Sequence, residues 1–259
     1  MFLKKDFFTI LLNMTTDHKK ILQTFASLSL DEEKHVYFLD NKPLKTSVSS
    51  KIKKFYEPFN KEAKAEEITS HTRKLKRGTS KYAGLSKKEI LDMWEKKKNK
   101  SCENGTEDHN FAERYVLQGR RLKPKTNKQK AIKNFIDSLP LHIKIVTPEI
   151  KMWHFKDMYC GTADLLLYNA ISGKYIIVDY KTNIDLFKNF EGQKMLKPFK
   201  NKLDTPFSHY EIQLSYYQIM LEQIENVEVE RRIIIWLLPN CTNKMYDTED
   251  LTKTLKNVA

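Results

Sequence analysis

The residues best suited to chemistry in this chain are three carboxylates and a lysine, Glu149, Asp164, Asp179 and Lys181. Each carboxylate stands between apolar or aromatic neighbours, although such charges normally face solvent. Carboxylate oxygens suit Mg²⁺ or Mn²⁺, whereas zinc favours histidine and cysteine. A lysine beside such a metal holds the attacking water and offsets negative charge that develops on a phosphate. The set therefore predicts metal-assisted hydrolysis of phosphodiesters.

Helices around a small mixed sheet are the elements expected to position these side chains. A hydrophobic period of two predicts strands over Ile143–Trp153, Met158–Tyr168 and Tyr175–Tyr180, and a continuous apolar run predicts another over Arg232–Leu238. A further strand-like run lies at His35–Leu39. Capping residues predict helices from Ser47 to Tyr56, from Ser86 through Trp94, from Thr106, from Asn127 to Leu139 and from Ser208 through Ile224. The helices at Ser86 and Ser208 are expected to begin with capping boxes closed by Glu89 and Glu211. The fold class is therefore α/β.

The predicted register of the strands brings the carboxylates together. A loop over 169–174 places Asp164 directly opposite Asp179, and side-chain alternation turns Lys181 to the same face. A loop over 154–157 makes Glu149 face Thr162, one diagonal step from Asp164. The alternative interpretation is a pair of strand-end aspartates that face water, with Lys181 as their salt-bridge partner. Convergence of all four residues on one face favours a site.

Composition limits the classes of protein and partner that remain. The 259 residues include 40% hydrophobic ones and only 7 Gly and 8 Pro, which excludes disordered, collagen-like and low-complexity chains. No apolar run approaches the ~18–20 residues of a membrane helix. A net charge of +13 indicates a polyanionic partner, for which nucleic acid is favoured over an acidic membrane surface. Cys102, Cys160 and Cys241 are odd in number and far apart, which favours a reducing, cytoplasmic setting.

The chain is expected to consist of an extension and one domain. Residues 1–45 form the extension, and residues 46–259 form the domain, with a helical, basic part over 46–140 and the catalytic sheet over 141–240. The segment Lys4–Leu12 weakly resembles a signal peptide. Because Asp6 interrupts it and no small-residue cleavage site follows, an N-terminal helix or arm is preferred.

Several short motifs resemble those of the PD-(D/E)XK nuclease superfamily, in its RecB-like branch. They are Gly161-Thr162-Ala163-Asp164, Asp179-Tyr180-Lys181-Thr182, and Gln213 with Tyr217 on one helix, preceded by the helix residue His109 and the strand residue Glu149. The resemblance covers about residues 46–238, and its upstream part is similar to nucleases of bacteriophages and large DNA viruses. Ala163 stands where the family often has proline. The resemblance implies a restriction-endonuclease-like core.

The resemblance also implies a role for each matched residue. Asp164, Asp179 and the backbone carbonyl of Tyr180 bind Mg²⁺, for which Mn²⁺ substitutes, with His109 as a further ligand and Glu149 as a ligand or water holder. Lys181 positions or activates water, and Gln213 and Tyr217 brace the site or contact the DNA backbone. The scattered cysteines argue against the iron–sulfur cluster of some relatives. Two alternatives stay open: His109 pairs with Glu113 within its helix, and Tyr217 is plain core packing.

The resemblance implies a Mg²⁺-dependent DNA nuclease, with an exonuclease of viral or phage-type replication, recombination or repair as the specific expectation. Replication or recombination proteins are further expected partners, and a membrane is not. The predicted phosphate contacts are Arg73, Lys74, Lys76, Arg77, Lys81, Lys188, Lys194, Lys197, Lys200 and Lys202. Tyr82, Trp94 and Phe199 are expected to stack on bases or to be buried. The alternatives are a catalytically silent or partner-dependent DNA-binding protein on the same fold, and an RNA-directed nuclease.

Overall fold

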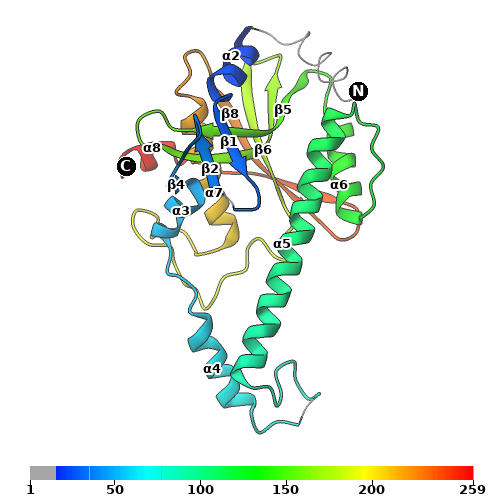
Figure 1. Ribbon diagram of the computed structural model, residues 1–259, viewed down its shortest axis with the longest axis vertical. Coiled ribbons are helices and arrows are strands. Elements are labelled where there is room, and N and C mark those ends of the chain that lie inside the picture. The colour runs from blue at the N-terminus through cyan, green and yellow to red at the C-terminus, as the bar shows by residue number, and fades with distance from the viewer. Residues whose placement is uncertain (1–15, 35, 77, 259) are drawn as a thin grey trace. The chain divides into compact units, whose positions relative to one another are not determined.

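The computed structural model describes residues 16–34, 36–76 and 78–258 (Figure 1). The chain divides into two compact units, a smaller one of residues 57–108 and a larger one that contains the remaining described residues. Residues 16–45, expected as an extension, therefore belong to the larger unit, and the expected helical part over 46–140 is divided between the two units. The predicted arm at Lys4–Leu12 lies outside the described residues.

A mixed sheet forms the centre of the larger unit and confirms the predicted α/β class. Its strands are β4 (Thr46–Ser47), β5 (Ile143–Trp153), β6 (Tyr159–Asn169), β7 (Lys174–Lys181), β8 (Val229–Leu237) and β9 (Asn243–Asp247). The order is β4-β6-β7-β8-β9, with β5 paired to β6. The β4–β6 and β7–β8 pairs are parallel and the others are antiparallel. The predicted strands match β5 to β8, and β4 and β9 were not predicted.

One predicted register is confirmed and the other is wrong. Tyr168 pairs with Tyr175 and Leu165 with Val178, as the loop over 169–174 requires. In the first hairpin Lys151, and not Glu149, pairs with Thr162. The turn is displaced by one residue along the chain, because the backbone N–H of His154 donates to the carbonyl of Tyr159 at 2.8 Å and Trp153 pairs with Cys160. A shift of two residues preserves the face of each side chain, so Glu149 stays on the face of Asp164 and moves level with it.

Helices cover both faces of this sheet (Figure 1). The helices on one face share a core with the apolar side chains of β5 to β8; they are α2 (Thr16–Phe25), α3 (Val48–Ile52), α7 (Pro206–Leu221) and α8 (Thr252–Lys256). On the other face, α6 (Asn127–Asp137) and the C-terminal part of α5 (Lys87–Leu117) pack on a second core. A separate antiparallel sheet is formed by β1 (Leu28–Asp31), β2 (Val36–Leu39) and β3 (Lys42–Pro43). No helix among the described residues is long and apolar enough to span a membrane.

The helix expected to begin at Thr106 does not exist as a separate element. Helix α5 is continuous over Lys87–Leu117 and passes through Gly105 and Thr106. A glycine inside a helix costs only ~1 kcal/mol, and the buried stripe that includes Phe111 and Tyr115 offsets that cost. The start of α5 is as predicted, because Ser86 and Glu89 exchange hydrogen bonds as a capping box.

The start of α7 was predicted three residues too late. Its N-cap is Thr205, whose side chain accepts a hydrogen bond from the backbone N–H of Ser208, and Pro206 opens the first turn. The expected capping box at Ser208 is therefore wrong. Glu211 instead accepts a hydrogen bond from Lys202 at 2.8 Å.

The smaller unit contains α4 (Lys61–Thr72) and the N-terminal part of α5. Lys87 forms ion pairs with Glu62 at 3.3 Å and with Glu66 at 3.4 Å. Near the turn that precedes α5, the indole N–H of Trp94 donates to the hydroxyl of Tyr82 at 3.0 Å. Trp94 is therefore half-buried against its own unit.

Candidate metal centre and the residues around it

The site lies where the edge of β6 is left open. On that edge β6 pairs with β4 at Tyr159 and Cys160 and with β7 from Leu165 onward. Among the described strands, none pairs with this edge over residues 161–164. The carboxylate of Asp164 takes the place of a backbone acceptor here, because its Oδ2 accepts a hydrogen bond from the backbone N–H of Tyr180 on β7 at 2.6 Å.

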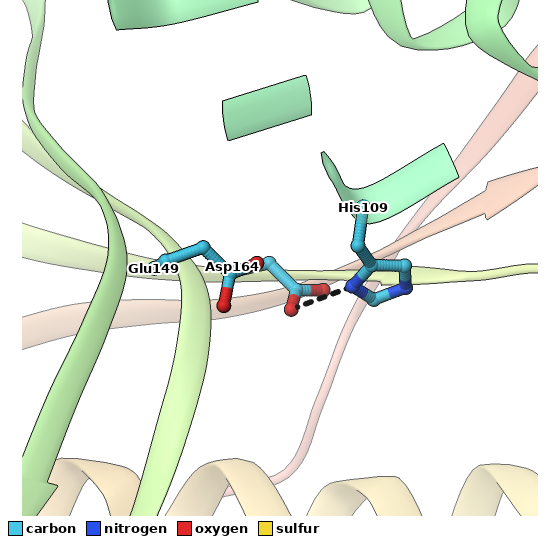
Figure 2. Close-up of side chains that lie close together, drawn as sticks. All are labelled: His109, Glu149 and Asp164. Atoms are coloured by element: carbon cyan, nitrogen blue, oxygen red, sulfur yellow. Dashed lines mark hydrogen bonds and ion pairs between the residues drawn. The ribbon is translucent and has the colours of Figure 1, made fainter. Parts of the chain in front are cut away.

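Three side chains from different elements converge at this opening (Figure 2). His109 comes from α5, Glu149 from β5 and Asp164 from β6, and one ligand atom of each lies within 4.8 Å of the others. His109 Nδ1 lies 3.0 Å from Asp164 Oδ1. The contact with Asp164 rules out the alternative in which the imidazole pairs with Glu113.

Burial and the neighbouring charges shift the pKa of each side chain in this group. Burial disfavours the charge of Asp164, but the charge and hydrogen bond of His109 outweigh it and lower the pKa of the carboxyl. Burial alone would lower the pKa of His109, but Asp164 outweighs it and raises that pKa to about 9. Burial and the nearby Asp164 raise the pKa of Glu149 to about 8. A metal ion held by this group would take the place of the imidazolium proton, because a histidine ligand must be neutral.

Glu149 also has an unusual backbone conformation. Its φ is 46°, in the left-handed region that residues other than glycine rarely adopt. The flanking pairs Pro148–Leu165 and Ile150–Ala163 continue the ladder on both sides. A strained backbone inside a paired strand is typical of functional sites. Here the strained residue is the one whose carboxylate faces Asp164.

Asp179 and Lys181 form a second, adjacent pair. The two side chains are joined by an ion pair, and both are largely buried. Burial raises the pKa of Asp179 to about 6 even though Lys181 acts in the opposite direction. Burial disfavours the charge of Lys181, but Asp179 outweighs it and raises the pKa of the ammonium group. Asp179 is 2% exposed and Asp164 is 7% exposed, which excludes the interpretation that they are strand-end residues facing water.

The group of three potential ligands does not include Asp179, which the resemblance made a metal ligand. In the structure the Asp179 carboxylate is paired with Lys181. Ligation by Asp179 and by the carbonyl of Tyr180 remains a prediction.

Gln213 and Tyr217 lie together on α7, as their spacing predicts. The side-chain amide of Gln213 donates to the Tyr217 hydroxyl at 2.8 Å. Tyr217 is buried and belongs to the core that α7 shares with the sheet. Its ring packs directly on Gly161, where an added Cβ would lie 2.6 Å from Cε1 of Tyr217. Tyr217 is thus both core packing and a support for the segment that ends at Asp164.

Substituting Gly161 with alanine is expected to destabilise the fold and to disturb the site. The added methyl group clashes with the Tyr217 ring and lies 3.3 Å from Cγ2 of Val48. Overpacking of this kind costs about 1–3 kcal/mol. Urea unfolding measures that loss, and a variant that matches the wild-type protein within about 0.5 kcal/mol contradicts the packing argument.

Sequence reasoning missed three residues near the site. The hydroxyl of Tyr37 lies 2.9 Å from the hydroxyl of Thr162. Burial raises the pKa of Tyr37 to about 12, although the hydrogen bond with Thr162 acts in the opposite direction. Lys181 Nζ lies 4.1 Å from the centre of the Tyr210 ring. Glu113 acts electrostatically on Glu149. Glu113 had a signal, because it follows His109 by one helical turn, whereas nothing local links Tyr37 to β6.

The predicted phosphate contacts have different surroundings. The exposed ones are Arg73, Lys74, Lys76 and Lys81 in the smaller unit and Lys188, Lys194, Lys197 and Lys200 in the larger one. Arg77 lies outside the described residues. Lys202 is already engaged by Glu211 and Glu249. Phe199 is buried against Phe55, which is the second of the two environments expected for it. Contact of the remaining residues with nucleic acid stays a prediction.

Without bound metal, the protein is expected to lose stability as the pH rises from about 4.5 to about 8. The pKa of Glu149 is 4.5 ordinarily and about 8 when folded, so the folded state binds this proton more tightly. The bound proton contributes on the order of a few kcal/mol to the free energy of unfolding. This contribution is fully present below the pKa of Glu149 in the unfolded state and is lost as the pH rises through its pKa in the folded state.

Urea unfolding in EDTA at about pH 5 and about pH 8 measures this effect. A Glu149→Gln variant should show a smaller change between the two pH values. Glu103→Gln, at an exposed position of α5, is the matched control and should behave like the wild type. Equal pH dependence in all three proteins would show that Glu149 does not bind the proton in this way.

Comparison of the chain with protein-family models gives no match, and comparison with curated proteins gives none either.

Proposed function

We propose that this chain is a metal-dependent phosphodiesterase of the PD-(D/E)XK class, built on a restriction-endonuclease-like core. Within that class, we infer a DNA nuclease that acts with Mg²⁺ or Mn²⁺, and an exonuclease in particular. The observation that carries the proposal is the group of His109, Glu149 and Asp164 beside the buried pair of Asp179 and Lys181. The proposed biological setting is viral or phage-type DNA replication, recombination or repair.

The donor set fits a divalent cation that prefers oxygen. Two carboxylates and one imidazole offer ligand atoms within 4.8 Å of one another. Burial and the neighbouring charge of Asp164 raise the pKa of Glu149, so a cation bound between the two carboxylates would stabilise the charged form of Glu149. Carboxylates with a single imidazole suit Mn²⁺ and Mg²⁺ better than zinc. A cation bound there would polarise a phosphoryl oxygen and make a bound water more acidic.

The side chains of this chain have distinct parts in the proposed reaction. Lys181 remains charged, because its pairing with Asp179 outweighs its burial, and its ammonium group offsets negative charge that develops on the phosphate. The Tyr210 ring beside Lys181 Nζ limits the positions of that group. Asp164 links His109 to the backbone of Tyr180 and so orients the imidazole.

A nucleic-acid substrate is supported by charge. The net charge is +13, and exposed lysines and arginines of both units offer contacts to phosphates that are independent of base sequence. DNA is proposed as the substrate, and RNA is the competing substrate. The other alternative is a catalytically silent or partner-dependent DNA-binding protein.

Digestion of matched substrates tests the proposal. The purified protein is incubated with end-labelled single- and double-stranded linear DNA, closed circular DNA and RNA of the same sequence, each with Mg²⁺, Mn²⁺ or EDTA. Metal-dependent loss of linear DNA with intact circles supports an exonuclease, and nicked circles indicate an endonuclease. Faster loss of RNA overturns the choice of substrate, and binding without any cleavage favours the catalytically silent alternative.

A further inference from the structure

A hollow of about 250 Å³ lies in the larger unit, away from the carboxylates. It is lined by α3, by the turn between β5 and β6, by α7 and by α8, and its walls include Lys51, His154, Lys156, Tyr159, Tyr216 and Lys256. None of these residues belongs to the candidate metal centre. Tyr159 and Asp164 are five residues apart on β6, which corresponds to about 16 Å along a strand.

The wall of this hollow carries an excess of positive charge. Three lysines line it, and Asp157 is the one carboxylate among the lining residues. In the described part of the chain, no carboxylate forms an ion pair with Lys51, Lys156 or Lys256, whereas Lys202 is paired with two. Three ammonium groups therefore stand around a hollow whose lining includes a single carboxylate, that of Asp157.

Lys51 is held over aromatic rings. Its Nζ lies 4.6 Å from the centre of the Tyr159 ring and 5.5 Å from that of Tyr216. The side chain is half-buried, and burial lowers the pKa of its ammonium group. The cation–π contacts fix a partly desolvated cation in the wall, where an anion gains more from it than from a lysine in free solvent.

His154 adds a neutral donor to the same wall. Its ring stacks on Tyr159 at 4.9 Å, and Nδ1 accepts a hydrogen bond from the backbone N–H of Asp157 at 3.0 Å. That bond places the ring proton of the neutral imidazole on Nε2. Burial lowers the pKa of His154, and the charge of Asp157 opposes that effect. The charges of Lys51, Lys156 and Lys256 act in the same direction as burial, so all three lysines act on one imidazole.

The turn that carries His154 and Lys156 is fixed to the end of α7. The backbone N–H of Phe155 donates to the side chain of Gln223 at 2.9 Å, and Gln223 in turn donates to the carbonyl of Trp153 at 2.7 Å. The two bonds join one amide to the residues immediately before and after His154. The donors of the hollow are therefore positioned before any ligand arrives, which reduces the cost of ordering on binding.

We propose that this hollow binds a phosphate group, supplied by a nucleic-acid strand or by a free nucleotide. Its volume is smaller than the ~300–1,000 Å³ of pockets that enclose drug-sized ligands, so it accommodates a phosphate with part of its sugar and not a larger cofactor. Lysine ammonium groups and an imidazole N–H are donors that phosphate oxygens accept. The proposal goes beyond the cleavage reaction, because this binding needs no divalent cation.

Binding measured without metal tests the proposal separately from cleavage. Calorimetric titrations in EDTA use the full chain with inorganic phosphate, a mononucleotide or a single-stranded oligonucleotide as the ligand. The test variant is K51Q/K156Q/K256Q. The control is K19Q/K130Q/K144Q, which makes the same charge change at exposed lysines outside the hollow. Thermal melting checks that both variants fold, and K256Q alone serves as a milder variant on the short helix α8.

The affinity of the test variant is expected to fall at least tenfold, while that of the control stays within about twofold of the wild type. If this pattern holds for phosphate and the mononucleotide, the source of the ligand is a free nucleotide. If it holds for the oligonucleotide alone, the site contacts a nucleic-acid backbone. Equal binding by all three proteins, or no binding by any of them, overturns the proposal, whatever the outcome of the cleavage assay.

Discussion

Substitution of Asp164 with asparagine is expected to lower metal-dependent DNA cleavage by about 10³-fold or more, with the fold retained. Asp164 combines three tasks, because it belongs to the group of potential ligands, bonds His109 and accepts the backbone N–H of Tyr180. The amide oxygen of asparagine still accepts from Tyr180. The negative charge that attracts a cation and keeps His109 protonated is lost.

Single-turnover cleavage rates and the rise in melting temperature on addition of Mn²⁺ measure this effect together. Both should collapse in Asp164→Asn, because the variant loses affinity for the metal as well as activity. Asp185→Asn is the matched control, since Asp185 is an exposed carboxylate four residues after Lys181. Cleavage by Asp164→Asn within tenfold of the wild-type rate would remove Asp164 from the proposed centre.

Substitution of Lys181 with methionine is expected to remove cleavage and to destabilise the fold by about 3–5 kcal/mol. Asp179 is 2% exposed, and loss of its partner leaves an uncompensated buried charge. The pKa of Asp179 is already about 6 and should rise further without Lys181. Below that pKa the carboxyl is neutral, so the destabilisation should be smaller at about pH 5 than at about pH 8.

The double variant D179N/K181M separates stability from catalysis. Replacement of both charges should restore most of the free energy of unfolding, because neither partner is then a buried unpaired ion. Cleavage should remain at least ~10²-fold below wild type, since the ammonium group is still absent. Lys130→Met, at an exposed position of α6 outside the predicted phosphate contacts, is the control for loss of one positive charge.

Two results would contradict this account of the pair. Wild-type cleavage by the double variant would show that Lys181 has no part in the reaction. A Lys181→Met variant whose free energy of unfolding lies within about 1 kcal/mol of wild type would show that the buried pair contributes little to the fold.

Local patterns in the sequence were sufficient for the main strands and for one register. Alternation of apolar side chains predicts β5, whereas β7 and β8 carry continuous apolar runs and are covered by helices on both faces. The β6–β7 register follows from a short loop that leaves few ways to align Tyr168 with Tyr175. The capping box at Ser86 is also local, because its bonds join residues three apart. Features of this kind depend on neighbours in the chain.

Where local signals compete, the tertiary structure decides between them. Gly105 and Thr106 favour a helix boundary, but the continuous α5 buries Phe111 and Tyr115 against the sheet and passes through both residues. Ser208 and Glu211 fit a capping box, but Glu211 is held by Lys202, and Thr205 caps the helix instead. In each case a packing or ion-pair contact outweighs a local preference of about 1 kcal/mol.

The sequence by itself determined the residue types and the strands that carry Asp164, Asp179 and Lys181. Only the tertiary structure decided that His109, 55 residues before Asp164, bonds that carboxylate. It also decided that Glu149 lies level with Asp164. The physical reason is that a strand's period is set by adjacent residues, whereas contacts between distant segments depend on how helices and turns pack on the sheet, which has no local signature.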